Sequence, residues 1–215
     1  MQLRRQLQFA KAKISSNGWR AFLATLPGST AEERLCYNRS DNVWLTFDDF
    51  AEPPVVHGIL AILTCTNVKA MFFLSGEWAA RHPKLVDEIR GAGHIVGTHG
   101  MAHKNLRHLD KTGLEAELTD GLGSTYMRPP YGEINGLARR IIAAKNLKIV
   151  GWSIDSQDWR GISPDQIKRN VLGKLHPGAV ILMHLHPENT SKVLRDLIEG
   201  IESRGYTLPR LKAER

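Results

Sequence analysis

The sequence predicts an α/β fold, a single distorted (β/α) barrel of parallel strands with helices on the outside. From Val43 onward, short apolar runs alternate with amphipathic segments, which is the pattern of parallel strands connected by helices. In addition, nearly every cluster of ionisable residues directly follows an apolar run. The carboxyl ends of barrel strands converge on one face, where catalytic residues gather, so these clusters favour a barrel with one site. A chain of 215 residues is long enough for one such domain with a substantial core.

Six apolar runs are short and partly β-branched, as expected of buried parallel strands. They are residues 43–47, 70–74, 94–97, 124–127, 148–152 and 179–183. Amphipathic helices are predicted between and after these runs, at residues 55–63, 83–92, 137–145, 164–175 and 191–204. Two of these helices have start signals, because Pro83 and Pro164 suit a first helical turn and Ser163 can cap the second helix.

Residues 1–40 differ in composition from the rest and are predicted to form a helical N-terminal extension, whereas residues 41–215 form the domain that carries the site. No apolar run approaches the roughly 20 residues that cross a bilayer, so no membrane span is expected. The segment from Met1 to Phe9 is basic but lacks the apolar stretch of a secretory signal, which predicts a cytoplasmic protein. Secretion is the alternative if the natural chain is longer than this sequence.

The net charge of +7 and the isoelectric point of about 9.6 would suit an anionic partner. The basic residues are dispersed, however, and no nucleic-acid-binding motif accompanies them, so we expect no nucleic-acid partner. Cys36 and Cys65 form neither a C-x-x-C motif nor a zinc-ribbon spacing. They are predicted to be reduced, partly buried thiols, with a disulfide as the alternative in a secreted protein. The oligomeric state is left open.

A candidate metal site combines carboxylates from one predicted strand end with histidines from another. Asp48 and Asp49 follow the first apolar run, and such adjacent carboxylates repel each other unless a positive group lies nearby. A simple turn or helix cap is the structural alternative. His99 and His103 are four residues apart and would share one face on a helical turn. Two imidazoles and a carboxylate form a facial set that suits zinc or a similar divalent ion.

Gly97 and Gly100, which flank the first of these histidines, favour a different local structure from a helical turn. Glycine at a strand end allows the backbone to approach a neighbour closely. The segment Arg128–Gly132 follows another strand, and its two prolines fix an extended path that can aim a backbone N–H at a developing oxyanion. A proline-rich connector is the alternative. Arg128 itself, if buried at the strand end, requires a carboxylate partner.

Two further clusters lie near the C-terminal half of the predicted sheet. Asp155 and Asp158 lie between Trp152 and Trp159, which favours a cleft with an apolar wall and an oriented charge. His184 ends the last predicted strand and is a candidate general acid if a carboxylate raises its pKa. His186 is a further polar group or an indirect contact of the site.

Taken in order, these motifs resemble those of the polysaccharide deacetylase family, which is carbohydrate esterase family four or the NodB homology domain. Thr46–Asp49 resembles TFDDG, and His99–His103 with Leu106 resembles H-[S/T]-x-x-H followed by leucine. Arg128–Gly132 matches RPPYG. Asp155–Trp159 resembles D-x-x-D-W, and Leu182–His184 resembles L-x-H. All five motifs occur in the family's order, and the likeness covers the chain from Val43 to Leu208.

The resemblance implies a NodB-type fold and a metal-dependent hydrolase that removes N-acetyl groups from a glycan or oligosaccharide containing N-acetylglucosamine. The implied metal ligands are Asp49, His99 and His103, and the expected ion is Zn²⁺, with Co²⁺, Ni²⁺ or Mn²⁺ as alternatives. Deacetylation of a small acetylated glycoside or metabolite, or hydrolysis of an O-acetyl ester, is the alternative activity. A catalytically silent carbohydrate-binding member would have lost a ligand or catalytic group, and this chain keeps them all.

The resemblance also implies a role for each remaining motif residue. Asp48 would be the general base that activates the attacking water, and Arg128 would hold and tune it. His184 would protonate the leaving amine, with Asp158 as its paired carboxylate. The other implied positions are in substrate binding: the Tyr131 backbone N–H at the oxyanion, Trp159 and Leu182 as walls of the acetyl pocket, and Pro130 in the same loop as Tyr131.

Four departures from the family pattern affect the expected substrate rather than the expected chemistry. Phe50 replaces the usual glycine after the two aspartates, and this change would reshape the mouth of the site. Gly100 replaces the usual serine or threonine, so one supporting hydrogen bond is expected to be lost. Leu185 stands where an aspartate often follows the histidine. The segment from Leu109 to Arg128 is short, which indicates a trimmed helix.

Overall fold

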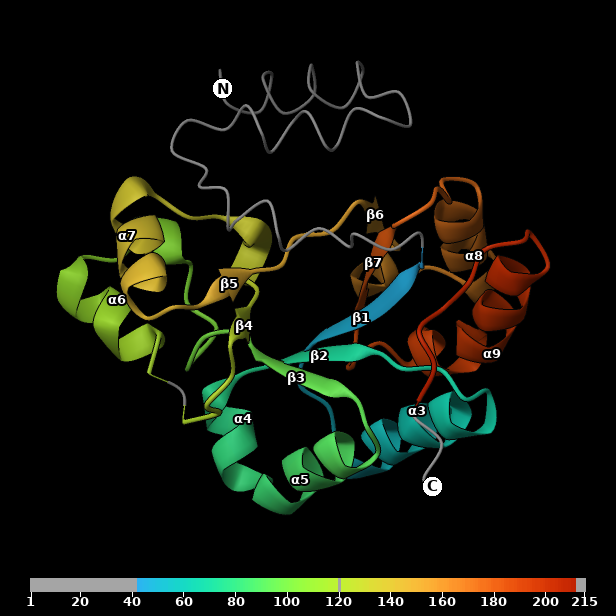
Figure 1. Ribbon diagram of the computed structural model, residues 1–215, viewed down its shortest axis with the longest axis horizontal. Helices are drawn as coiled ribbons and strands as arrows, with labels where there is room; N and C mark the ends of the chain where they lie inside the picture. The colour runs from blue at the N-terminus through green and yellow to red at the C-terminus, as the bar shows by residue number, and fades with distance from the viewer. Residues whose placement is uncertain (1–41, 120, 212–215) are drawn as a thin grey trace.

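Seven short parallel strands form one curved sheet in the part of the chain that the structure describes, residues 42–119 and 121–211. The strands are β1 (Trp44–Asp49), β2 (Met71–Leu74), β3 (Ile95–Thr98), β4 (Tyr126–Met127), β5 (Lys148–Ile149), β6 (Ile154–Asp155) and β7 (Val180–His184). Their order is β5-β4-β3-β2-β1-β7-β6, and each neighbouring pair is parallel. In this computed structural model the sheet is curled as a half-barrel with β5 and β6 at its edges, which confirms the predicted barrel-like α/β fold (Figure 1).

Helices surround this sheet on its outer side (Figure 1). They are α3 (Pro53–Cys65), α4 (Gly76–Arg81), α5 (Pro83–Gly91), α6 (Lys111–Glu117), α7 (Gly136–Ala144), α8 (Pro164–Leu172) and α9 (Glu188–Glu202). The pair α6 and α7 lies beside β4 and β5, and the pair α8 and α9 lies at the opposite end beside β7. Helices α3, α4 and α5 lie along the middle of the sheet, where β1, β2 and β3 are found.

The main core is built around β1, which lies beside the central strand β2 in the sheet. Leu45 and Phe47 are fully buried on this strand, and the Phe47 ring stacks on that of Phe72 in β2 at 5.3 Å between centroids. The main core joins the sheet to α3, α8 and α9 through aliphatic side chains such as Ile59. Burying a side chain of this size stabilises the fold by about 1.5–3 kcal/mol, so the buried apolar residues of the strands contribute strongly to its stability.

A second core lies under α6 and α7 and anchors a loop that is important for the site. Leu106 follows β3 in the chain and packs fully buried with Leu114 of α6 and Met127 of β4. Because Leu106 is fixed in this way, the loop between β3 and α6 is attached at both ends to packed elements.

Most sequence predictions of secondary structure are confirmed, and the errors concern short elements. Ser163 caps α8 as predicted, since its Oγ accepts a hydrogen bond from the Gln166 N–H at 3.3 Å. Among the strands and α-helices, the two-residue strand β6 and the short helix α4 were not predicted. Helix α6 is a short helix within the segment from Leu109 to Arg128, where a trimmed helix was expected. Helix α8 ends three residues earlier than predicted, and α9 begins three residues earlier, directly after Pro187.

Two predictions from the sequence fall partly or wholly outside the described residues. The helical extension at residues 1–40 and Cys36 lie outside them, so that extension stays a prediction. Cys65, at the end of α3, is exposed, and the prediction of a partly buried thiol is wrong for this cysteine because the end of the helix faces solvent. Within residues 42–119 and 121–211, no helix has both the length and the apolar character needed to cross a membrane.

Candidate active site

The carboxyl ends of three strands bring four of the predicted site residues together. Asp48 and Asp49 end β1, His99 directly follows β3, and His184 ends β7. In the sheet, Asp48 of β1 is the register partner of His184 in β7. The expectation that clusters at strand ends would meet on one face is therefore confirmed for these residues.

Asp49, His99 and His103 form a compact set of potential ligand atoms. Asp49 Oδ1 lies 3.4 Å from His99 Nε2 and 3.1 Å from His103 Nε2. One donor atom from each residue lies within 4.8 Å of the others. A single divalent ion between them would be bound by one oxygen and two nitrogens, a set that fits zinc and several other transition metals.

The hydrogen bonds around this triad support the fit to a cation. Asp49 Oδ1 is buried and has no hydrogen-bond partner among the described residues, although both imidazole nitrogens are close to it. Such an orphaned buried oxygen is costly unless a cation or another partner satisfies it. The His99 Nδ1–H donates to the main-chain carbonyl of Arg128 at 2.7 Å, since a carbonyl can only accept. This bond fixes the tautomer, so His99 Nε2 presents its lone pair toward Asp49.

The loop that carries both histidines is not a helical turn, in agreement with the local structure that Gly97 and Gly100 favour in the sequence. Residues 99–105 have no helical structure, and His103 has a positive φ of 56°. Asp49 also has a positive φ, of 75°. Non-glycine residues rarely adopt this conformation, and where they do the surrounding structure must stabilise it. The alternative interpretation, a close backbone approach at the glycines, describes the loop correctly.

Arg128 is fully buried and contacts Asp48, which supplies the positive partner expected for the aspartate pair. Its Nη1 donates to Asp48 Oδ1 at 2.6 Å and to Thr46 Oγ1 at 2.8 Å. Its Nε and Nη2 donate to the main-chain carbonyls of Val150 and Gly151 at 3.0 and 2.9 Å. Burial lowers the pKa of Arg128, and the charge of Asp48 opposes this shift only in part. The guanidinium is held in one orientation by these bonds, and with it the Asp48 carboxyl group.

His184 is paired with Asp158 on the other side of β1. Its Nδ1 lies 2.7 Å from Asp158 Oδ1, and its backbone N–H donates to Asp158 Oδ2 at 2.8 Å. Thr190 Oγ1–H donates to the same Oδ2 at 2.6 Å. Burial by itself would lower the pKa of His184, but the hydrogen bond and the charge of Asp158 raise it overall. Burial would likewise raise the pKa of Asp158, but its hydrogen bonds, chiefly that from His184, lower it overall.

The residues predicted to bind substrate fall into two groups. Tyr131 and Trp159 are 63% and 54% exposed, and the Tyr131 ring packs edge-on against His103 at 4.8 Å between centroids. Leu182 and Pro130 are buried beneath this surface. Phe50 is 50% exposed, and among the described residues these three aromatics are the exposed large hydrophobic side chains. Each lies next to a site residue in the chain or in space, and we refer to Phe50, Tyr131 and Trp159 together as the aromatic rim.

Asp155 and His186 do not lie where the sequence pattern suggests. Asp155 Oδ1 accepts a hydrogen bond from the Gln157 N–H at 2.8 Å and so stabilises a turn rather than entering the site. His186 approaches the site more closely than its sequence context indicates, with Nδ1 at 3.4 Å from Asp49 Oδ2. Sequence reasoning missed Glu117, a buried residue at the end of α6 whose carboxyl oxygen accepts hydrogen bonds from the loop on both sides of His103. A single acidic residue on a short helix carries no signal of its own.

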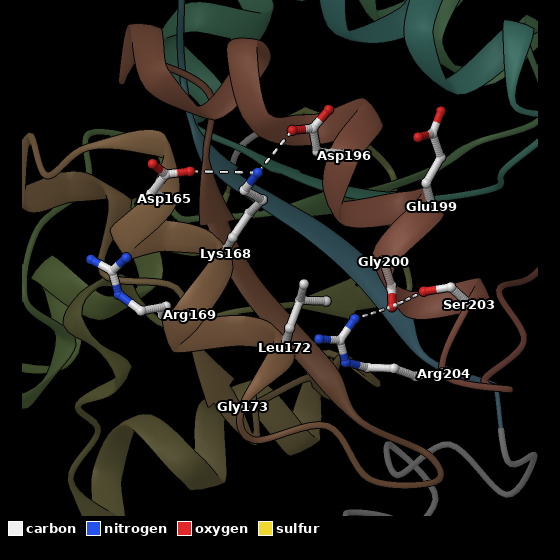
Figure 2. Close-up of a pocket in the computed structure, with 10 residues that line it drawn as sticks. All are labelled: Asp165, Lys168, Arg169, Leu172, Gly173, Asp196, Glu199, Gly200, Ser203 and Arg204. Atoms are coloured by element: carbon white, nitrogen blue, oxygen red, sulfur yellow. Dashed lines mark hydrogen bonds and ion pairs between the residues drawn. The ribbon is translucent and has the colours of Figure 1, made fainter.

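A surface groove between α8 and α9 is separate from this set of residues. Figure 2 shows the ten residues that line it, none of which is a predicted site residue. Lys168 lies in its centre and forms ion pairs with Asp165 at 3.5 Å and Asp196 at 3.0 Å. Arg169 and Arg204 donate instead to Gln166 and to the Gly200 carbonyl. Because the groove contains none of the motif residues, it does not compete with the strand ends as the functional site.

Comparison with known proteins agrees with the motifs. The profile of the family described as polysaccharide deacetylase matches residues 37–150. A peptidoglycan-N-acetylglucosamine deacetylase of Bacillus cereus is 36% identical over 189 residues, which cover 80% of this chain and 68% of that protein. The peptidoglycan-N-acetylglucosamine deacetylase PgdA of Listeria monocytogenes is 33% identical, over 75% of this chain and 36% of that protein. A chitooligosaccharide deacetylase of Bradyrhizobium is 28% identical, over 78% of this chain and 87% of that protein. The chain thus spans only about a third of the length of some of these relatives.

Solved structures agree on the fold. A crystal structure of a peptidoglycan N-acetylglucosamine deacetylase in complex with an N-oxidanyl-benzamide superposes with a TM-score of 0.75 at 33% identity, covering 82% of this chain and 92% of that one. A pseudoenzyme of carbohydrate esterase family four from Bacillus anthracis also has a TM-score of 0.75, at 27% identity, covering 80% of this chain and 64% of that one. From its fold, its strand-end residues and these similarities, the chain belongs to the polysaccharide deacetylase family.

Proposed function

We propose that this protein is a metal-dependent N-deacetylase of a glycan or oligosaccharide that contains N-acetylglucosamine. The observation that carries this proposal is that a candidate base, a candidate acid and a candidate metal site lie together at the ends of β1 and β7. Asp48 and His184 lie on neighbouring strands beside the Asp49–His99–His103 triad. A base and an acid on either side of a Lewis-acid site are what hydrolysis of an amide requires.

A divalent ion held by Asp49, His99 and His103 would supply a Lewis acid that polarises the carbonyl oxygen of the acetamide. Asp48 Oδ2 lies 3.8 Å from His99 Nε2, so one oxygen of Asp48 faces the triad while the other is bonded to Arg128. In the proposed reaction, Asp48 takes a proton from water as the water oxygen attacks the acetyl carbon.

The second half of the reaction needs a proton on the leaving nitrogen. His184 gives its Nε2 proton to that nitrogen as the carbon–nitrogen bond breaks, which yields acetate and a free amine. Asp158 stabilises the protonated imidazole through Nδ1. The backbone N–H of Tyr131 is assigned to the developing oxyanion. Trp159 and Leu182 are assigned to the walls of the acetyl pocket, with Pro130 supporting the loop.

The substrate class rests on similarity and on the aromatic rim. The Bacillus and Listeria relatives are named for peptidoglycan and the Bradyrhizobium relative for chitooligosaccharides. The aromatic rim suits the apolar faces of pyranose rings. We propose an N-acetylglucosamine polymer as the substrate and Zn²⁺ as the native ion, because zinc combines with this donor set and keeps positions open for water.

The proposal is tested by acetate release from acetylated chitooligosaccharides, peptidoglycan and O-acetylated xylan. The protein is stripped with a chelator and reloaded with Zn²⁺, Co²⁺, Ni²⁺ or Mn²⁺. We expect metal-dependent release from at least one N-acetylated glycan, and a loss of about 10²- to 10⁴-fold in Asp48→Asn. Release from the O-acetylated substrate alone would favour an esterase. Sugar binding without any release by the reloaded protein would favour a silent member of the family.

Metal content gives an independent readout of the ligand assignment. His99→Ala should lose bound metal in elemental analysis. The matched control is His57→Ala, since His57 is an exposed histidine on α3 that pairs with Glu88 at 3.0 Å. Full occupancy in His99→Ala would refute the proposed ligand set.

A further inference from the structure

Glu117, on helix α6, is a buried acidic residue that lies outside all five motifs. Its exposed fraction is 2%, and its side chain points into the loop that carries the histidines. Glu117 Oε1 accepts hydrogen bonds from the backbone N–H groups of Ala102 at 2.9 Å and Lys104 at 2.8 Å. These are the residues directly before and after His103. The backbone carbonyl of Glu117 also accepts from the Met101 N–H at 2.8 Å.

One residue therefore holds three backbone N–H groups of the loop around a potential metal ligand. This loop has no regular secondary structure, so its part-buried N–H groups take their partners from other parts of the fold. His103 also has a φ of 56°, a left-handed conformation that is strained for a non-glycine residue. The two bonds from Glu117 fix the residues on both sides of His103 and so keep it in that conformation.

Gly100 explains how the carboxyl group of Glu117 reaches the loop. Gly100 has a φ of +80°, and a Cβ atom built on it would lie 2.7 Å from Glu117 Oε1. A side chain at position 100 would thus occupy the space that Glu117 uses. The family pattern has serine or threonine at position 100. In this chain, glycine leaves that space free, and the carboxyl group of Glu117 occupies it.

Helix α6 is itself well fixed, which makes it a suitable support. Asp110 caps the helix, because its Oδ1 accepts from the Gly113 N–H at 2.8 Å. Leu114 is fully buried in the second core together with Leu106, which ends the histidine loop. The carboxyl group of Glu117 is thus delivered from an element that is packed against the same loop.

We propose that Glu117 is a positioning residue for the metal site and acts through His103. By fixing the backbone around His103, it holds the His103 Nε2 atom at its distance from Asp49 and His99, so that metal affinity depends on it. Residues that orient metal ligands from outside the ligand set typically change affinity by about 10- to 100-fold. The inference rests on the proposed function in one respect, namely that the triad binds a divalent ion.

The test measures the dissociation constant of Zn²⁺ by competition with a chromophoric chelator, together with the melting temperature of the metal-free protein. Glu117→Ala should bind Zn²⁺ about 10- to 100-fold more weakly than the wild type. Glu117→Gln keeps an oxygen acceptor of the same length and should stay within a few-fold of the wild type. Glu115→Ala is the matched control, because Glu115 lies on the same helix but is exposed and pairs only distantly with Lys111.

A purely structural role would lower the melting temperature of metal-free Glu117→Ala and leave its Zn²⁺ affinity within twofold of the wild type, and this result would overturn the proposal. Should Glu117→Ala not fold, Gly100→Ala provides the test, since its Cβ displaces the same oxygen. We expect at least tenfold weaker binding in that variant, and unchanged affinity would equally overturn the proposal. Failure of the wild type to bind any divalent ion would instead contradict the proposed function.

Discussion

Asp48 and His184 are register partners on the adjacent parallel strands β1 and β7. The Leu185 N–H donates to the Asp48 carbonyl at 3.0 Å, so this pairing continues to the ends of both strands. Neighbouring strands lie about 4.8 Å apart. The distance between the proposed base and acid is thus set by the hydrogen bonds of the sheet and not by a loop. A substrate group bound between them would meet both at a fixed spacing.

The pairing of His184 with Asp158 leads to a prediction about the pH dependence of activity. The charge of Asp158 raises the pKa of His184, which keeps the imidazole protonated to higher pH. Asp158→Asn removes that charge, so the alkaline limb of the kcat/KM profile should move to lower pH. The maximal rate should also fall, by about 10²-fold.

The profile is measured with the same metal loaded into both proteins, so that only the variant differs. Asp155→Asn serves as the control, because Asp155 bonds to the Gln157 N–H in a turn and does not contact His184. An alkaline limb that stays in place in Asp158→Asn would contradict the role of His184 as the acid.

Arg128 provides a prediction about stability. Arg128→Met would remove four hydrogen bonds and leave Asp48, which is 3% exposed, without its positive partner. Breaking a buried ion pair in this way costs about 3–5 kcal/mol. Arg128→Lys keeps the charge but cannot reproduce the planar set of bonds, so it should recover only part of the loss.

Urea unfolding of the metal-free protein measures this effect without interference from bound metal. The control is Arg107→Met, which breaks an exposed ion pair with Glu133 at 4.0 Å and should cost less than about 1 kcal/mol. Equal losses in Arg128→Met and Arg107→Met would show that the buried pair adds no stability.

The sequence was sufficient to predict that the candidate ligands Asp49, His99 and His103 lie together, because the ionisable clusters follow the strands. Carboxyl ends of parallel strands share one edge, so residues such as Asp49 and His99, far apart in the chain, had to meet there. The buried strands were also predictable, because their apolar runs are continuous. In contrast, β6 has only two residues and pairs only with β7. A two-residue strand has no sequence pattern that distinguishes it from a loop.

Other features depend on contacts that no spacing reveals. The glycines near His99 favour an irregular loop over a helical turn, but nothing in the sequence indicates that Glu117 holds this loop through the N–H groups beside His103. His186 reaches Asp49 because the chain turns after β7, a path that the pattern after Leu185 does not specify. Such contacts join residues across the fold and have no local signature in the sequence.

Phe50, which replaces the usual glycine, leads to a prediction about the substrate. Its ring is 50% exposed next to Asp49, so the side chain is available to contact a sugar at the mouth of the site. Removing this apolar surface in Phe50→Gly should weaken binding of a chitooligosaccharide by about 1 kcal/mol, which corresponds to a roughly fivefold higher KM. The effect on a single acetylated glucosamine should be smaller, because that substrate does not extend to the mouth.

Both KM values are determined from acetate release, and Phe50→Trp is the matched variant that keeps an aromatic ring. We expect Phe50→Trp to stay near the wild type for the longer substrate. A lower KM for the chitooligosaccharide in Phe50→Gly would mean instead that the Phe50 ring obstructs the mouth of the active site.

His94 leads to the last prediction, which concerns stability at acid pH. It is 5% exposed, its Nδ1 accepts from the Ala70 N–H at 3.3 Å, and its Nε2 has no hydrogen-bond partner among the described residues. Burial, together with the positive charge of Lys69, lowers the pKa of His94 from 6.5 to about 4. The folded protein therefore keeps this imidazole neutral over a pH range in which the unfolded chain binds a proton.

Because the unfolded state binds more protons between about pH 6.5 and pH 4, the stability from His94 is fully present above this range and is lost as the pH falls through it. The size of the loss is roughly 3 kcal/mol at pH 4. His94→Asn keeps an acceptor for the Ala70 N–H but does not titrate, so its free energy of unfolding should fall less between pH 7 and pH 4. Urea unfolding of the two metal-free proteins at several pH values measures the difference, and parallel pH profiles would contradict the assignment of a neutral, buried His94.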